Sequence, residues 1–305
     1  GRRGDRNRTS ACDGAEASAA HISSPLLASF GRDLPKVLRP RVLCLHGFGM
    51  EAAPMASMLT RDQAWGSAWA EAGLEPDIIS LEGPHPSLQG ESMLRTATAH
   101  FQSSSSSSSS SRSGGQPAGL SLDSLHGAAP DASGRCWWYA RQGAGDAGLA
   151  ASEWSYVGVE ESLCLVEQAL RHHGPVDCLL GFSQGASLAA LCLALLPQAP
   201  CAAVLVAGFA PRDAALARRL TEALPRLQAT RTLHVMGRRD PIVPPAVSHE
   251  LCGLLCEAGE GVVAETCEHR GGHGGWRRDK EVRRSICQFI SKAAEEADAV
   301  RSSSL

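Results

Sequence analysis

Three residues of this sequence have the types and order that nucleophilic catalysis by a serine requires. A serine hydroxyl becomes a nucleophile when a histidine takes its proton and a carboxylate orients that histidine. Ser183 stands in the pattern Gly-x-Ser-x-Gly, which places a serine at the tip of a sharp strand-to-helix turn. Asp240 and His273 follow it, each in a loop just past an apolar run. The pattern predicts a catalytic triad of Ser183, Asp240 and His273.

Other residues compete for the acid and base roles. Asp213 could supply the carboxylate, but its position before an amphipathic stretch predicts a helix cap. His269 could act as the base, although it lies closer to the end of its apolar run. His85 precedes the serine in the chain, the wrong order for this arrangement, but its loop could border the cleft.

An oxyanion hole needs two N–H donors that point at the developing negative charge. One donor is expected from Gln184, the residue after the nucleophile. The other is expected from the glycine-rich loop at 46–49, where we favour the N–H of Phe48 and keep that of Gly49 as the alternative.

Short apolar runs alternate with amphipathic stretches, and this alternation has to position the candidate residues. It predicts an α/β fold with a mostly parallel sheet and helices on both faces, built from right-handed βαβ units. Chemistry in such folds lies at the carboxyl ends of the strands, the edge where the predicted triad loops meet. The predicted strands are 41–46, 77–81, 176–180, 202–207, 232–237 and 262–268, and the predicted helices are 54–72, 157–172, 184–196, 213–224, 248–257 and 280–294.

The alternation covers only part of the chain, which divides into one domain and segments of other composition. We predict a single domain over 38–298, with a low-complexity insertion at about 86–134 that contains nine consecutive serines. Polyserine has no apolar surface to bury, so the insertion is expected to be disordered. Residues 1–37 and 299–305 are predicted to be disordered tails.

Aromatic residues follow the insertion. Trp137 and Trp138 either pack a strand or loop onto the domain or form the wall of a substrate pocket, and the two interpretations are compatible. With His85, they are the candidate pocket residues.

Composition excludes several classes of function. The chain has 305 residues and a net charge of −3, which gives no electrostatic case for binding nucleic acid. No run of 18 apolar residues predicts a transmembrane helix. The 11 cysteines are odd in number and scattered, and with no signal peptide in the sequence they favour a reducing compartment.

No cofactor is predicted, because neither a dinucleotide fingerprint nor a phosphate-binding loop is present. Cys267, His269 and His273 have spacings that could suggest zinc, but a clear fourth ligand is missing and the triad explains His273 better. We predict no metal site.

Taken together, these motifs resemble the eukaryotic FSH family of serine hydrolases over roughly residues 41–290. The resemblance implies an α/β-hydrolase fold without a large separate lid, the same three triad residues, and carboxylic-ester or thioester hydrolysis through an acyl-enzyme. It also implies a cytoplasmic or nuclear location. The residues that carry it are Val42-Leu-Cys-Leu-His-Gly-Phe-Gly49, Gly83-Pro-His85, Trp137-Trp138, Gly158-Val-Glu-Glu-Ser-Leu163, Leu180-Gly-Phe-Ser-Gln-Gly-Ala186, Asp240 with Val243-Pro244, and Gly271-Gly-His273.

Two features depart from the family pattern. The family histidine is usually followed closely by a proline, whereas Gly274-Gly275-Trp276 follows His273 here and predicts a looser loop. The polyserine insertion is also atypical.

The sequence thus predicts a serine hydrolase that cleaves carboxylic esters of medium to long acyl or alkyl chains, small-molecule substrates. A thioesterase or acyltransferase acting on carrier-bound acyl chains would use the same triad and is the main alternative. A binding module without catalysis is the third hypothesis, disfavoured because no triad member is missing. The oligomeric state is left open.

Overall fold

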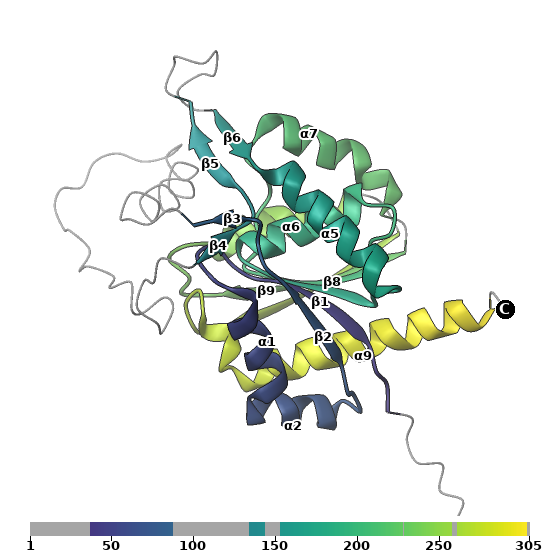
Figure 1. The fold of residues 1–305 in the computed structure, drawn as a ribbon. Helices are drawn as coiled ribbons and strands as arrows, with labels where there is room; N and C mark the ends of the chain where they lie inside the picture. Colours follow the sequence, from purple (N-terminus) through teal and green to yellow (C-terminus); the bar gives the residue numbers. More distant parts are fainter. Residues whose placement is uncertain (1–36, 88–133, 144–152, 228, 258–260, 304–305) are drawn as a thin grey trace, which may run out of the picture. The chain divides into compact units, whose positions relative to one another are not determined.

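Six parallel strands form the central sheet of the computed structural model, which describes residues 37–87, 134–143, 153–227, 229–257 and 261–303 (Figure 1). Their order across the sheet is β10-β9-β8-β7-β1-β2, and every neighbouring pair is parallel. All described residues belong to one unit, Val37–Leu305. The strands are β1 (Arg41–Leu45), β2 (Asp77–Leu81), β7 (Cys178–Phe182), β8 (Ala202–Val206), β9 (Thr230–Gly237) and β10 (Val262–His269).

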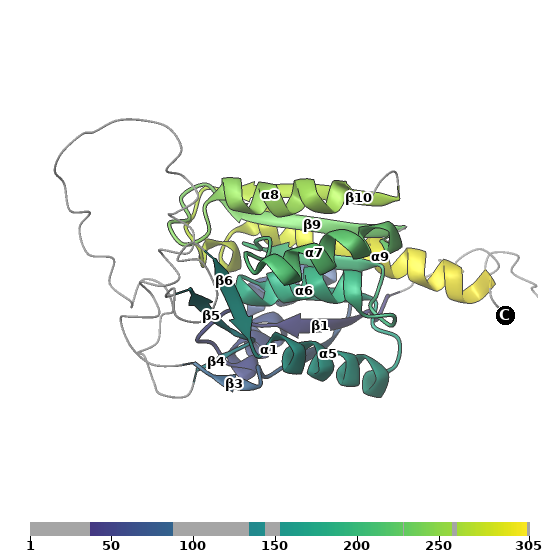
Figure 2. The same ribbon diagram turned by 90° about the horizontal axis from the view of Figure 1, so that it is seen from above.

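Helices cover both faces of this sheet, as predicted. One face carries α5, α6 and α7, and the opposite face carries α1, α2 and α9 (Figure 1). Helix α8 packs against β9 and β10 (Figure 2). The helices are α1 (Ala52–Arg61), α2 (Gln63–Glu71), α5 (Val159–His173), α6 (Gln184–Leu195), α7 (Ala214–Ala223), α8 (Pro245–Cys256) and α9 (Lys280–Ser303), with short 3₁₀ turns at Leu224–Arg226 and Gly275–Arg277.

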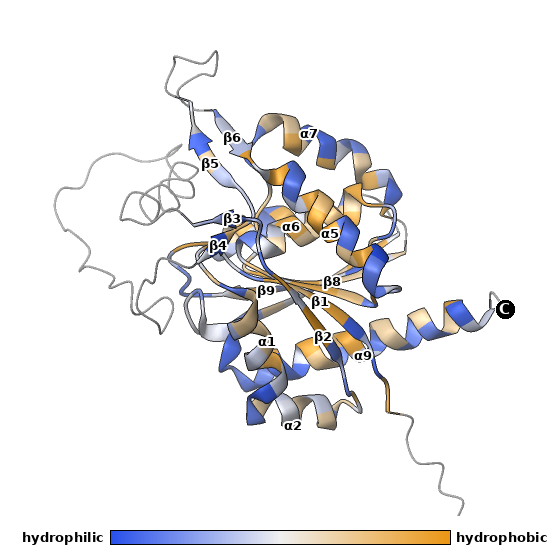
Figure 3. Ribbon diagram, viewed as in Figure 1, coloured by the Kyte–Doolittle hydropathy of each residue, from blue (hydrophilic) through white to orange (hydrophobic). Residues whose placement is uncertain are grey.

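Hydropathy explains these layers. Strands β7 and β8 are buried along their whole length, as expected for parallel strands that are covered on both faces. Helix α6 is buried over all but its last residue, whereas α9 alternates apolar and charged residues (Figure 3). The most deeply buried helix is therefore the one that follows the predicted nucleophile.

Two short antiparallel pairs lie outside the main sheet. Strand β3 (His85–Pro86) pairs with β4 (Arg135–Cys136), and β5 (Tyr139–Gln142) pairs with β6 (Trp154–Val157). The β3–β4 pair joins the two ends of the predicted insertion at its base. The polyserine tract itself lies outside the described residues, as does the predicted N-terminal tail apart from Val37.

The helix predicted over 54–72 is in fact two helices. Asp62 has an extended backbone between α1 and α2, and its carboxylate accepts hydrogen bonds from the N–H groups of Ala64 and Trp65. Aspartate favours such a cap over a mid-helix position because its short side chain competes for backbone N–H groups. The apolar periodicity was continuous across the break, so it did not reveal it.

The last helix is longer than predicted. Helix α9 continues to Ser303, past the expected helix end at 294 and the expected domain boundary at 298. Its final turn is held by Arg301, which donates to Asp177 and to Asp298. The assignment of 299–305 to a disordered tail is therefore corrected as far as Ser303.

Candidate active site

Ser183 occupies a sharp turn between the end of β7 and the start of α6. Its backbone has φ 54° and ψ −116°, a conformation that costs a non-glycine residue roughly 1–3 kcal/mol. The surrounding chain holds it there. Ser183 N–H donates to the carbonyl of Val206 on β8, and the serine carbonyl accepts from Ala186 N–H.

The flanking glycines are required by close backbone approach. A Cβ on Gly181 would overlap the backbone of Gly185 and Ala186, and a Cβ on Gly185 would overlap the carbonyls of Leu45 and His46. The turn therefore presses the start of α6 against the end of β1. This contact brings the nucleophile candidate next to the loop that is predicted to complete the oxyanion hole.

Asp240 and His273 form a hydrogen bond at the carboxyl ends of β9 and β10. His273 Nδ1 lies 2.7 Å from Asp240 Oδ2, and the side chains are 7% and 1% exposed. The other carboxylate oxygen accepts the N–H groups of Ile242 and Val243, each at 2.9 Å. Asp240 is thus fixed by its own loop, and it fixes one edge of the imidazole.

The structure brings His273 close to the serine turn without joining the two by a hydrogen bond among the described residues. The ring of Phe182, the residue before Ser183, lies 4.8 Å from the His273 ring between centroids. Long or missing serine–histidine hydrogen bonds are common in unliganded serine hydrolases, because the contact tightens when substrate binds.

The loop that carries His273 is not left loose by its glycines. Trp276 is 1% exposed and packs against Phe182 and Trp65. Before His273, the ring of His269 accepts the Gly271 N–H through Nδ1 at 3.1 Å. An anchoring tryptophan and a buried histidine thus hold the loop that the missing proline led us to expect to be loose.

The two predicted oxyanion donors both remain available. Within the described chain, neither Phe48 N–H nor Gln184 N–H has a protein acceptor. The alternative prediction, Gly49 N–H as the donor, is wrong, because this group already donates to the carbonyl of Arg135 at 2.8 Å. Gln184 also begins α6, so its N–H lies at the positive end of the helix dipole.

His46 begins the loop at 46–49, which is predicted to supply an oxyanion donor, and it is fully buried. Gly83 N–H donates to its Nε2 at 2.9 Å, so the ring proton sits on Nδ1, which donates to the Gly47 carbonyl. Burial lowers the pKa of His46, and the nearby Arg135 adds to this effect against the opposing influence of Gly47 and Glu82. The imidazole is therefore neutral and uses both nitrogens to hold backbone.

The rival acid and base candidates have other partners. Asp213 caps α7 through Leu216 N–H and also accepts from Tyr156 N–H, so its predicted role as a helix cap is confirmed. His85, a pocket candidate, contacts the Gly158 carbonyl through Nε2 at 2.9 Å.

The two pocket tryptophans are buried against the nucleophile turn. Trp137 is 0% exposed, and its indole N–H donates to the His46 carbonyl. Trp138 is 2% exposed and stacks on Tyr156 at 5.2 Å. The Gln184 side chain accepts from Trp137 N–H and donates to the Trp138 carbonyl. The tryptophans thus belong to the inner packing of the site rather than to an open surface.

Among the described residues, no group of three or more histidine, cysteine or acidic side chains is placed to hold a metal ion. His273 is engaged by Asp240, and His269 by Gly271. The ten described cysteines are free thiols.

The comparison with known proteins assigns the family. The model of the serine hydrolase family FSH1 matches residues 38–275. The chain belongs to this family. As a member of a serine hydrolase family it is a hydrolase, and the resemblance inferred from the motifs is confirmed.

Related members of the family are named esterases. Esterase OVCA2 of Homo sapiens is 33% identical over 241 residues, covering 76% of this chain and 88% of the human protein. Its Bos taurus counterpart is 40% identical over 162 residues, covering 48% and 66% of the two chains. Esterase CG5412 of Drosophila melanogaster is 27% identical over 238 residues, covering 76% and 67%.

Solved structures agree on the fold. Arabidopsis thaliana SOBER1 is 16% identical, with a TM-score of 0.50 over 84% of this chain and 99% of that one. Esterase PE8 is 17% identical, with a TM-score of 0.51 over 85% and 96%. At such identities these structures support the α/β-hydrolase fold alone, and that predicted fold is confirmed.

Two members of this FSH1 site were missed by sequence reasoning. Gln184 was expected to contribute only its backbone N–H. Its side-chain amide also forms hydrogen bonds with the backbones of Trp137 and Trp138. Arg135 was not singled out, although it contacts the oxyanion loop. The only available signal was its place beside the tryptophan pair.

None of the described helices is long and apolar enough to span a membrane.

Proposed function

We propose that this FSH1-family hydrolase cleaves carboxylic esters of medium to long acyl or alkyl chains, through an acyl-enzyme on Ser183. The observation that carries the proposal is the buried 2.7 Å contact between His273 and Asp240 beside the strained Ser183 turn. A histidine oriented by a carboxylate next to an activated serine is the arrangement that acyl transfer needs. The relatives named esterases support the same reaction class.

The roles follow from hydrogen-bond chemistry. Asp240 can only accept, so the proton on His273 lies on Nδ1 and the lone pair on Nε2. Nε2 takes the Ser183 proton as the hydroxyl oxygen attacks the ester carbonyl. The proton then passes to the leaving alcohol. Water, activated by the same Nε2, attacks the acyl-enzyme and releases the acid, which restores Ser183.

The N–H groups of Phe48 and Gln184 are assigned as the hydrogen-bond donors that stabilise the negative oxygen of each tetrahedral intermediate. Neither N–H has an acceptor among the described residues, which supports this assignment, since an oxyanion donor must be available to the substrate. In the same proposal the buried Trp137 and Trp138 form the inner aromatic packing behind the acyl site, and His85 on β3 is the third pocket residue. No cofactor enters the reaction.

Steady-state hydrolysis of p-nitrophenyl butyrate, octanoate and laurate tests the proposal. The wild-type protein should turn over these esters, and Ser183→Ala should lower kcat by about 10⁴-fold or more. Ser303→Ala, at the exposed end of α9, is the matched control and should keep wild-type kcat. Equal rates for wild type and Ser183→Ala would refute the proposal.

The same assay separates the related reactions. A decanoyl thioester offered in parallel reports thioesterase activity, and added alcohol reports acyl transfer through a new ester product. A kcat/KM for the thioester well above that for the oxygen ester would replace the ester in this proposal by a thioester. Ester product as the major outcome with alcohol present would replace hydrolysis by transfer.

A further inference from the structure

The oxyanion loop at 46–50 has little structure of its own. It follows β1 and precedes α1, and its one internal backbone hydrogen bond, Met50 N–H to the Gly47 carbonyl, is 3.2 Å long. Gly49 has φ +71°, a conformation that glycine adopts freely. Because Phe48 N–H must point at the substrate, something else has to fix this loop.

Strand β4 supplies that support through its backbone. The Arg135 carbonyl accepts Gly49 N–H at 2.8 Å, and Arg135 N–H donates to the Met50 carbonyl at 2.9 Å. A Cβ on Gly134 would lie 2.5 Å from the Gly49 carbonyl oxygen, so the two backbones are in direct contact. Phe48 therefore lies directly before two residues that β4 holds.

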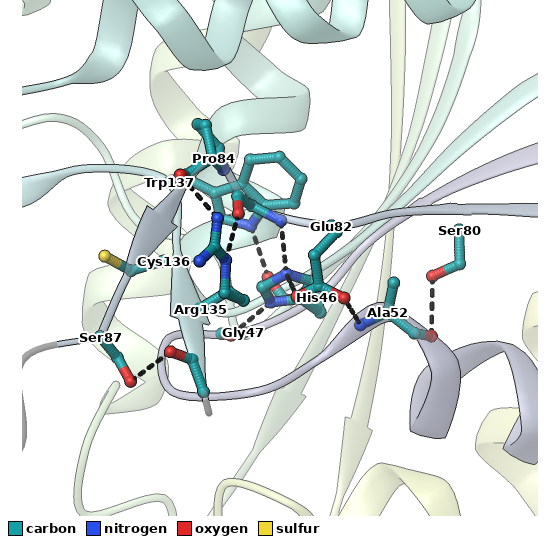
Figure 4. Close-up of polar contacts among 12 residues, drawn as sticks. His46, Gly47, Ala52, Ser80, Glu82, Pro84, Ser87, Arg135, Cys136 and Trp137 are labelled. Atoms are coloured by element: carbon teal, nitrogen blue, oxygen red, sulfur yellow. Dashed lines mark hydrogen bonds and ion pairs between the residues drawn. The ribbon is translucent and has the colours of Figure 1, made fainter. Parts of the chain in front are cut away.

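The Arg135 side chain ties the same strand to a second loop (Figure 4). Its Nε donates to the Gly83 carbonyl at 2.8 Å and an Nη to the Pro84 carbonyl at 2.7 Å. Gly83 N–H in turn donates to His46 Nε2, at the start of the oxyanion loop. No carboxylate lies within ion-pair distance of Arg135 in the described chain. The guanidinium therefore donates its hydrogen bonds to backbone carbonyls.

The residues after Arg135 hold the other oxyanion donor. Trp137 donates to the His46 carbonyl through its indole and to the Gln184 side chain through its backbone. The Gln184 side chain also donates to the Trp138 carbonyl. One segment, 135–138, thus binds both the loop of Phe48 and the residue whose N–H is the second donor.

We propose that Arg135 is a positioning residue for the oxyanion hole: with the segment 135–138 it fixes the spacing between the Phe48 and Gln184 N–H groups. This inference rests on the proposed function, because an oxyanion hole has meaning only for acyl transfer. It assigns to Arg135 an effect on the transition state, although the side chain touches neither the substrate nor the reacting atoms.

The test compares Arg135→Met and Arg135→Lys with Arg141→Met. Methionine keeps the stem and removes the donors. Lysine keeps the charge but lacks the planar fork that reaches two carbonyls. Arg141 lies on the exposed part of β5 and makes no ion pair with a described residue, so it controls for the loss of a surface arginine.

Kinetics must separate positioning from folding. All rates are divided by the concentration of serine that reacts with a fluorophosphonate, so that misfolded protein does not count. Arg135→Met should then lower kcat about 10- to 100-fold with KM changed less than about twofold. Arg135→Lys should fall between it and wild type, and Arg141→Met should match wild type.

A transition-state mimic gives the second readout. A trifluoromethyl ketone forms a tetrahedral adduct with the serine, so its inhibition constant should rise across the variants by the same factor as kcat/KM falls. Normalised kcat within twofold of wild type in Arg135→Met, or an inhibition constant that does not follow kcat/KM, would overturn the inference. A wild-type protein without esterase activity would overturn the proposed function, and this inference with it.

Discussion

At the scale of single residues, His273 is held from two sides. Asp240 accepts a hydrogen bond from its Nδ1 at 2.7 Å. Earlier in the same loop, the ring of His269 accepts the N–H of Gly271 and so fixes the backbone that leads to His273. Burial lowers the pKa of His269, against the opposing charges of Asp279 and Asp240. The ring therefore stays an acceptor. In the proposed mechanism a carboxylate orients the base, and a second histidine orients the backbone that carries it.

Replacing His269 should affect rate more than binding. We expect His269→Ala to lower kcat about 10-fold with little change in KM, because a shift of about 1 Å in a catalytic group is costly. His269→Asn should recover most of the loss, since its side-chain oxygen can stand in for Nδ1 as the acceptor. The measurement is kcat and KM for a p-nitrophenyl ester. Equal losses in both variants, or full activity in His269→Ala, would contradict this role.

The sequence was enough to propose the triad but not the residues that support it. Ser183, Asp240 and His273 each stand in a local pattern, and their order along the chain restricts the choice further. Arg135 and the Gln184 side chain act by hydrogen bonds to backbone carbonyls and amides far away in the sequence. Any residue has a backbone to accept or donate, so such contacts leave no pattern in a single sequence.

At the scale of elements, β9 carries a buried titratable group that catalysis does not use. His234 is 1% exposed, and its Nε2 lies 3.2 Å from Thr232 Oγ1 on the same strand. Burial, with a smaller contribution from His249 on α8, lowers the pKa of His234 from 6.5 to about 4. The strand is therefore built around a neutral imidazole.

This histidine should make the protein sensitive to mild acid. The unfolded chain takes up a proton below about pH 6.5 but the native chain does not until about pH 4, so native stability falls as pH drops through that window. The full difference is worth about 3 kcal/mol. His234→Asn, which does not titrate, should show a shallower loss.

Urea unfolding at a series of pH values between about 4 and 7.5 measures this loss. His172→Asn, on the exposed end of α5, is the control and should keep the wild-type slope. An unchanged slope in His234→Asn would contradict the assignment. Carboxylates that titrate near pH 4 contribute equally to all three proteins and drop out of the comparison.

The sequence predicts an element well where an apolar run is long. It fails where a single polar residue decides where a helix begins or ends. The strands of the parallel sheet follow from runs such as Ala202–Val206, which is buried throughout. The break between α1 and α2 depends on Asp62 choosing a cap, and the periodicity of Trp65 and Trp69 continues across it. The end of α9 depends on a tertiary contact.

At the scale of the whole molecule, a contact between Asp177 and Arg301 links the end of α9 to the start of the sheet. Asp177 precedes β7 and is 7% exposed at its side chain. Its carboxylate accepts Arg41 N–H at the start of β1 and the guanidinium of Arg301 at the end of α9. The contact lies at the amino ends of the strands, opposite the edge that carries Ser183.

Removing Arg301 should therefore cost stability and leave catalysis intact. We expect Arg301→Ala to lower the free energy of unfolding by about 1–3 kcal/mol, because it removes a charged partner from a buried carboxylate. Arg284→Ala, which breaks an exposed 3.7 Å pair with Glu281, should cost less than about 0.5 kcal/mol. Urea unfolding and kcat are the two readouts. Equal costs for both variants, or a fall in kcat, would contradict this account.

The identity of the nucleophile is the central claim, and one measurement tests it most directly. The protein is mixed with a p-nitrophenyl ester, quenched in acid during the first turnovers and digested, and the acylated peptide is located by mass spectrometry. We predict an acyl group on Ser183, in the peptide that contains Gly181 and Gly185, and none in Ser183→Ala. Ester turnover with the acyl group on another residue, or continued turnover by Ser183→Ala, would contradict the account.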